Sequence, residues 1–155
     1  MNTMQLECMI NCDELMKDKI VGIFAADQIP KIVRNRPMGF ICNTENHFEN
    51  GAHWIAFFIN EERRGIFFDS FAHSPDYYSR HFLKFFEHNA ISLEINQKRL
   101  QSENSSVCGQ YCIFILSLLC REYDLTNIHD FFSDNHQAND IFVFNVIGKT
   151  YSHCI

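Results

Sequence analysis

The amino-acid sequence predicts an α+β fold, in which a mixed β-sheet packs on a buried central helix and other helices flank it. Two observations lead to this prediction. Short runs rich in Ile and Phe, separated by turn-prone residues, alternate with stretches of helical periodicity. The segment from Cys108 to about Tyr123 is apolar nearly all round, as in a helix without a solvent-exposed face. Such a helix belongs at the centre, with the sheet packed on it.

Length and composition indicate one globular domain spanning residues 1–155. The chain contains 46% hydrophobic residues, with 16 Phe against only 3 Pro and 6 Gly, which suits a single substantial core. No apolar run approaches the roughly 18 residues that cross a membrane. The first residues are also too polar for a signal peptide. From these features we expect a soluble, intracellular protein.

The N-terminal part is expected to contain one short helix and an irregular stretch. Asn11 suits a helix N-cap and Glu14 follows at capping-box spacing, so a helix is predicted over Asn11–Lys19. The residues before it are expected to fray. Prolines interrupt Val21–Pro37, which is therefore predicted to be irregular, with at most a short helical turn.

Three Ile- and Phe-rich strands are predicted next, over Met38–Asn43, Ala52–Asn60 and Gly65–Asp69. Only four charged residues separate the second strand from the third, so these two should form a hairpin. A weak strand is predicted over Ile91–Ile95, and Lys98–Leu100 could continue it.

The other predicted elements are helices. Ser74 suits an N-cap and Pro75 the first helical position, so a helix begins there. Four aromatic residues at helical spacing give this helix a core face: Tyr78, Phe82, Phe85 and Phe86. Beyond the apolar helix, two further helices are predicted, over about Asn127–Phe132 and Gln137–Lys149.

Charge and cysteine content narrow the function classes. The net charge of −6 argues against broad nucleic-acid binding, which needs Lys and Arg opposite phosphates. Seven cysteines without the turn-rich composition of a small secreted scaffold favour free thiols over a disulfide framework. A zinc site built from Cys8-x3-Cys12 and Cys108-x3-Cys112 is a minor alternative. We expect no metal and no cofactor.

Cys108 is the candidate nucleophile. It ends the polar loop Gln101–Val107 and opens the apolar helix, so the backbone N–H groups and dipole of the helix should lower its pKa. A catalytic thiolate also needs a base, an orienting acid and an oxyanion donor. The best candidates are His53 at the start of one predicted strand, Asp69 at the end of the next, and Gln101. Each of these residues alone has an ordinary structural explanation, so the prediction rests on their combination.

The same residues carry a resemblance to the adenovirus protease (adenain) family, in a superfamily that includes the SUMO-specific proteases. The matching segments are Gly51-Ala52-His53-Trp54, Phe68-Asp69 and the run from Gln101 to Cys112, which fits Gln-x-x-Asn-Ser-x-x-Cys-Gly-x-x-Cys. The resemblance covers roughly Gly22 to Leu119. Val107 stands where SUMO-specific proteases usually carry Asp, which favours the viral branch.

The resemblance implies a cysteine endopeptidase with His53 as general base, Asp69 as orienting acid, Cys108 as nucleophile and Gln101 as oxyanion donor. It implies substrate-binding roles for Gly51, Trp54 and Asn104, with Trp54 as one wall of a narrow groove. The implied substrates are viral capsid or core precursors, cut at sites with small residues, commonly glycine. The implied location is the virion and the host nucleus or cytoplasm.

Three departures from adenovirus enzymes limit what can be carried over. The acid is Asp69 rather than Glu. Residues 70–100 contain no cysteine, so no activating peptide can be tethered there by a disulfide, although a non-covalent peptide activator remains open. The acidic net charge makes DNA unsuited as an essential cofactor. The alternative functions that remain open are a deubiquitinase or ubiquitin-like-modifier protease, an acetyltransferase and an inactive binding module.

Overall fold

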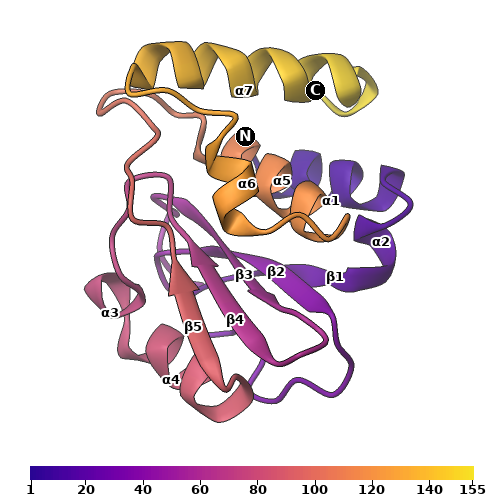
Figure 1. The fold of residues 1–155 in the computed structure, drawn as a ribbon, viewed down its shortest axis with the longest axis vertical. Helices are drawn as coiled ribbons and strands as arrows, with labels where there is room; N and C mark the ends of the chain where they lie inside the picture. Colours follow the sequence, from indigo (N-terminus) through magenta and orange to yellow (C-terminus); the bar gives the residue numbers. More distant parts are fainter.

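The fold is a five-stranded mixed sheet with helices on both faces (Figure 1). The computed structural model describes residues 1–155. The strands are β1 (Ile20–Phe24), β2 (Met38–Asn43), β3 (Trp54–Ile59), β4 (Arg64–Phe68) and β5 (Ser92–Ile95). The helices are α1 (Thr3–Cys12), α2 (Met16–Lys19), α3 (Pro75–Tyr78), α4 (Arg80–Asn89), α5 (Cys108–Leu119), α6 (Leu125–His129), α7 (His136–Thr150) and the 3-10 turn η1 (Ser152–Cys154). The predicted α+β class is confirmed.

The strands follow one another across the sheet in chain order, β1-β2-β3-β4-β5. The three central strands β2, β3 and β4 are antiparallel to one another, and each edge strand, β1 and β5, runs parallel to its one neighbour. The predicted hairpin is confirmed, with Ala56 opposite Phe68 in the β3–β4 register. Because β3 and β4 are antiparallel, the start of β3 and the end of β4 lie at the same edge of the sheet.

Each face of the sheet has its own apolar core. One core joins the sheet to α1, α5 and α7, and α5 contributes seven buried residues to it, as its uniform apolar sequence predicts. The other core packs α4 against the opposite face. There the Phe57 ring lies between Phe40 and Phe86, with ring centroids 4.5 and 5.3 Å away. Two cores of this kind hold the central strands rigidly in register.

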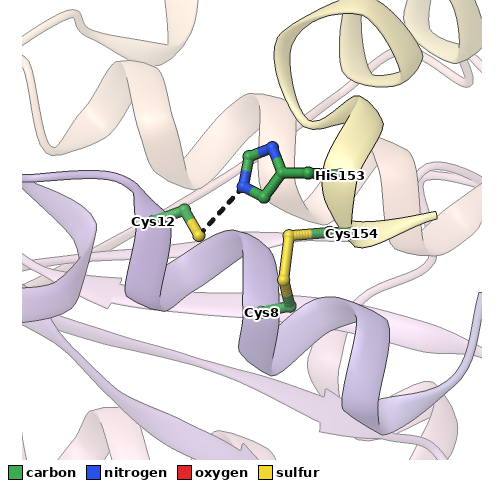
Figure 2. A group of neighbouring side chains, drawn as sticks. All are labelled: Cys8, Cys12, His153 and Cys154. Carbon is green, nitrogen blue, oxygen red and sulfur yellow. Dashed lines mark hydrogen bonds between the residues drawn. A yellow bond between two sulfur atoms is a disulfide. The ribbon is translucent and has the colours of Figure 1, made fainter.

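Two cysteines are paired, which corrects the prediction that all seven are free. Cys8 of α1 and Cys154 of η1 form a disulfide, with their Cα atoms 5.7 Å apart (Figure 2). The partners are 146 residues apart in the sequence, so only the packing of α1 beside the C-terminal turn brings them together. The other five cysteines are free.

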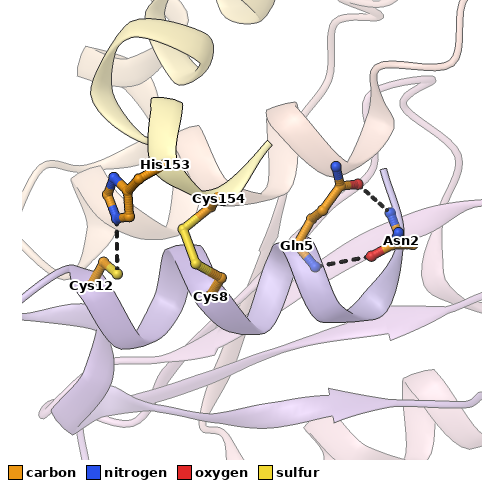
Figure 3. The surroundings of a disulfide bond; sticks show 6 residues. All are labelled: Asn2, Gln5, Cys8, Cys12, His153 and Cys154. Carbon is orange, nitrogen blue, oxygen red and sulfur yellow. Dashed lines mark hydrogen bonds between the residues drawn. A yellow bond between two sulfur atoms is a disulfide. The ribbon is translucent and has the colours of Figure 1, made fainter.

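The first turn of the chain is helical, so the predicted fraying is wrong. Of the helix predicted over Asn11–Lys19, only Met16–Lys19 forms a helix of its own, since Asn11 and Cys12 belong to α1. Asn2 and Gln5 form a capping box, with bonds of 2.9 and 3.0 Å (Figure 3). The helix ends at Cys12, because the Asp13 carboxylate captures the next backbone N–H groups, those of Leu15 and Met16. A separate short helix, α2, then follows.

Three smaller predictions are also corrected. The segment Val21–Pro37 is not wholly irregular, since most of β1 lies in it and pairs with β2. The helix predicted from Ser74 is broken at Ser79, whose hydroxyl caps α4, so Tyr78 belongs to the preceding turn. Lys98–Leu100 does not extend β5. None of the helices has the length and apolar character needed to cross a bilayer.

We predict that Gly65→Ala destabilises the sheet by about 1–3 kcal/mol, because overpacking forces neighbours to shift. A Cβ at Gly65 would lie 2.6 Å from Cδ1 of Phe86 and 3.1 Å from the Ser92 carbonyl oxygen. Gly148→Ala in α7 is the matched control, since its nearest neighbour is 4.0 Å away. Replacing this glycine within a helix should raise the free energy of unfolding by up to about 1 kcal/mol. Urea unfolding measures both changes, and equal midpoints for the two variants would contradict the described packing.

Candidate active site

His53 and Asp69 come together at the edge where β3 begins and β4 ends. His53 immediately precedes β3, and Asp69 immediately follows β4, so the hairpin register brings them side by side. Nε2 of His53 lies 2.6 Å from Oδ1 of Asp69, and both side chains are buried. The ring of Phe71 packs against the imidazole at a centroid distance of 4.9 Å. These contacts hold the ring in one orientation.

Cys108 is the first residue of α5, at the position the sequence predicts. Its sulfur is half-buried, and the His53 side chain and the backbone N–H groups of Trp54 and Gly109 lie where they stabilise a thiolate charge on it. Because Nε2 of His53 faces Asp69, Nδ1 is the ring nitrogen left for the sulfur. The structure therefore brings together three of the four residues predicted to do the chemistry.

The charges in this group favour a thiolate beside an imidazolium. Burial on its own would raise the pKa of Cys108, but the hydrogen bond and charge of His53 and the two backbone N–H groups lower it. Burial would likewise lower the pKa of His53, but its bonds to Asp69 and Cys108 raise it to about 9. At neutral pH the proton then resides on the ring, and the sulfur is a ready nucleophile.

Asp69 is held by more partners than the sequence indicates. Its carboxylate accepts the Tyr78 hydroxyl at 2.7 Å and the backbone N–H groups of Phe71 and His73 at 3.0 and 3.1 Å. Burial opposes ionisation, but the bonds to His53, Tyr78 and Phe71 keep the pKa of Asp69 below its usual range. The Asn96 amide anchors the backbone of Asp69 by two further bonds, of 3.0 and 2.7 Å.

Sequence reasoning missed these supporting residues. Tyr78 was expected to serve the core face of a helix, and its ring does pack beside the second core. The break at Ser79 turns its hydroxyl to Asp69 instead of leaving it in a continuous helix. Only the Ser after Tyr78, a frequent N-cap, could have signalled that break. Nothing in the sequence pairs Asn96 with Asp69.

Gln101 is buried near the site, but its side chain is already engaged. Its amide nitrogen donates to the carbonyl and hydroxyl oxygens of Ser105, each at 2.9 Å, and its oxygen accepts the Ser70 hydroxyl at 2.5 Å. In this arrangement Gln101 braces the loop before Cys108. To donate to an oxyanion at Cys108, its amide nitrogen would have to give up its hydrogen bonds to Ser105.

A cavity of about 500 Å³ opens beside Cys108. Gly51 and Trp54, two of the residues predicted to bind substrate, line it together with polar residues of the loop before β3. Gly51 has a φ of 83°, and a Cβ there would come within 2.8 Å of the Asn43 amide nitrogen. Asn104 lies in an exposed turn and is not among the lining residues.

Cys108, His53 and Asp69 form an arrangement suited to acyl transfer, and the alternative zinc site of Cys8, Cys12, Cys108 and Cys112 is not assembled. The cysteines of the alternative zinc site are separated, because Cys8 and Cys12 gather with His153 and Cys154 rather than with Cys108 and Cys112. Cys112 is fully buried, and burial raises its pKa well above the ordinary value. Only Cys108 therefore combines access to a cavity with stabilised thiolate charge.

Residues 20–138, more than half of the chain, match the family model described as adenovirus endoprotease. No curated protein sequence matches the chain significantly. Among solved structures, ChlaDub1 from Chlamydia trachomatis is similar in fold, with a TM-score of 0.58 at 11% identity, covering 96% of this chain and 76% of its own. A protease of ASFV aligns with a TM-score of 0.45 at 23% identity, covering 70% of this chain and 43% of its own.

We predict that Asp69→Asn slows alkylation of Cys108 by iodoacetamide at mildly acidic pH by about tenfold or more. Each unit by which the thiol pKa rises reduces the thiolate fraction tenfold, and an amide cannot hold the charge on His53. Tyr78→Phe, which removes one bond to Asp69, should have a smaller effect in the same direction. Asp134→Asn, at an exposed acid, is the control. Unchanged alkylation in Asp69→Asn would contradict the described coupling.

Proposed function

Because the chain belongs to the adenovirus endoprotease family, we propose that it is a thiol-dependent endopeptidase that cleaves capsid or core precursors of a virus or virus-like element. Membership of the family makes it a cysteine peptidase, with proteins as substrates. The observation that carries the site assignment is the His53–Asp69 bond beside the helix-terminal Cys108. Residues 1–155 act as one catalytic domain in this proposal.

In the first half-reaction the Cys108 thiolate attacks the carbonyl carbon of the scissile peptide bond. His53 then gives its proton to the leaving amine, and a thioester to Cys108 remains. In the second half-reaction His53 takes a proton from water as the water attacks the thioester, which releases the acid product and restores the thiolate–imidazolium pair. Asp69 keeps the imidazole oriented throughout and stabilises its charge.

The negative oxygen formed during both steps needs hydrogen-bond donors. The first backbone N–H groups of α5 have no carbonyl partner within the helix, so that of Cys108 is one proposed donor. Gln101 is the second proposed donor. Its amide lies on the loop that leads to Cys108, and substrate binding would have to draw it away from Ser105.

The substrate is proposed to bind along the cavity beside Cys108 as an extended chain. Trp54 forms one wall, and its indole nitrogen is already held by the Met1 carbonyl oxygen at 3.1 Å. Gly51 keeps the neighbouring wall free of a side chain. Residues without large side chains, above all glycine, suit a groove of this kind at the cleavage site. Asn104 is proposed to contact the substrate outside the cavity.

We predict that a peptidyl alkylating probe labels the protein and that Cys108→Ala abolishes the labelling. Cys112→Ala is the matched control, because Cys112 lies one helical turn further along α5 but is fully buried with a raised pKa. Intact-mass spectrometry should show one adduct on the wild type and on Cys112→Ala. Persistent labelling of Cys108→Ala would rule out the assigned nucleophile.

The substrate class is tested by incubating the active protein with glycine-containing virion precursor polypeptides and, separately, with ubiquitin-like fusions. Cleavage of the precursors, lost in Cys108→Ala, supports the proposal. Cleavage of the fusions alone would instead assign a deubiquitinase or ubiquitin-like-modifier protease, whose Gly-Gly substrates suit the same groove.

We predict a bell-shaped pH dependence of kcat/KM with its basic limb near pH 9, the pKa of His53. Above that pH the ring loses the proton that the leaving amine needs. The acidic limb reports protonation of the Cys108 thiolate and should fall below the ordinary thiol range, because its pKa is lowered. In Asp69→Asn the basic limb should move to lower pH. A basic limb that stays in place in this variant would contradict the role assigned to Asp69.

A further inference from the structure

A second cluster of reactive side chains lies between α1 and the C-terminal turn η1 (Figure 2). It consists of Cys8, Cys12, His153 and Cys154, whose sulfur and ring-nitrogen atoms all lie within 4.8 Å of one another. Nε2 of His153 is 3.1 Å from Sγ of Cys12, and Cys8 is bonded to Cys154. The catalytic chemistry uses none of these four residues.

The two elements that carry the cluster turn its side chains toward one another. Cys8 and Cys12 are four residues apart on α1, so they share one face of the helix, and that face meets η1 (Figure 3). His153 and Cys154 come from that single 3-10 turn. The arrangement therefore needs only two rigid segments to be held together.

One buried hydrogen bond, that of Tyr151 to Asp13, links those segments independently of the disulfide, and two further bonds fix the groups on either side of it. The Asp13 carboxylate, just past the end of α1, accepts the Tyr151 hydroxyl at 3.0 Å and an Arg121 nitrogen at 2.9 Å. The Cys154 backbone N–H donates to the Tyr151 carbonyl at 2.9 Å. Because these bonds do not involve sulfur, they can keep the four side chains grouped when the disulfide is reduced.

We propose that these four side chains bind one Zn²⁺ ion when the Cys8–Cys154 disulfide is reduced. Three cysteines and one histidine are a common structural zinc set, and the Cys-x3-Cys spacing lies within its usual range. Zn–S bonds of about 2.3 Å and a Zn–N bond of about 2.0 Å place tetrahedral ligands under 4 Å apart. The observed grouping is close to that spacing, and soft thiolates favour zinc over calcium or magnesium.

A small thiol can supply the two electrons that reduce the Cys8–Cys154 disulfide before zinc binds. Two equivalents of a small thiol reduce the disulfide, which yields the Cys8 and Cys154 thiols and one small-molecule disulfide. Zinc then displaces a proton from each of three cysteine thiols and takes the lone pair of Nε2 of neutral His153. Cys12 and His153 are exposed, so the metal can reach the site from solvent. This proposal departs from the expectation of a chain without metal.

The test uses protein reduced with a phosphine, in a Cys108→Ala background so that the active-site pair cannot hold metal. After one equivalent of Zn²⁺ or Co²⁺ and gel filtration, we expect about one metal ion per chain by atomic emission. Co²⁺ should show the visible bands of a tetrahedral thiolate site. Cys12→Ser and His153→Ala should each reduce the retained metal at least several-fold, because each removes an exposed ligand and leaves the other three in place.

His88→Ala, at an exposed histidine of α4 on the opposite face of the sheet, is the matched control and should retain its metal. Circular dichroism checks that each variant is folded. Loss of metal on gel filtration from the reduced parent protein would overturn the proposal. So would full retention by both Cys12→Ser and His153→Ala, or equal binding by protein whose disulfide is intact.

Discussion

The site depends on one short hydrogen bond, that between His53 and Asp69 at 2.6 Å. It exists because the β3–β4 register places the start of one strand beside the end of the other. A one-residue slip would turn every side chain of a strand to the opposite face, and the acid would no longer meet the ring. The phenylalanine core on the α4 side therefore does more than stabilise the sheet, because it maintains the register from which the geometry of the candidate site follows.

The same bond explains how a buried site can hold two charges. Burial opposes both the imidazolium and the thiolate, so the pair is stable only where other groups compensate. Asp69 compensates the ring, and its own charge is spread over Tyr78 and two backbone N–H groups. The backbone N–H groups of Trp54 and Gly109 compensate the negative charge of the Cys108 thiolate. Gly109 also packs against Met1, where a Cβ would lie 3.1 Å from the Met1 Cβ. The packing of the N-terminal segment thus reaches the first turn of α5.

Features set by local pattern were predictable from the sequence, and features set by distant contacts were not. The hairpin, the buried helix and the helix-terminal position of Cys108 follow from strand and helix periodicity, so they could be predicted. The hairpin and the helix start in turn carry the three side chains that the fold brings together, those of His53, Asp69 and Cys108. Asp13 is an exception, because its bonds to the backbone N–H groups of Leu15 and Met16 are local, and it was missed because the cap was assigned to Asn11 instead. The support of Asp69 by Asn96, 27 residues away, and the Cys8–Cys154 pair, 146 residues apart, have no sequence signature.

The central claim is that His53 is protonated at neutral pH because it shares its charge with Asp69 and the Cys108 thiolate. Nitrogen-15 NMR of histidine-labelled protein, with the ring signal of His53 assigned by loss in His53→Ala, measures this directly. The account predicts an imidazolium spectrum at neutral pH and deprotonation near pH 9. A neutral His53 ring at pH 7, titrating at or below the ordinary value of about 6.5, would contradict it.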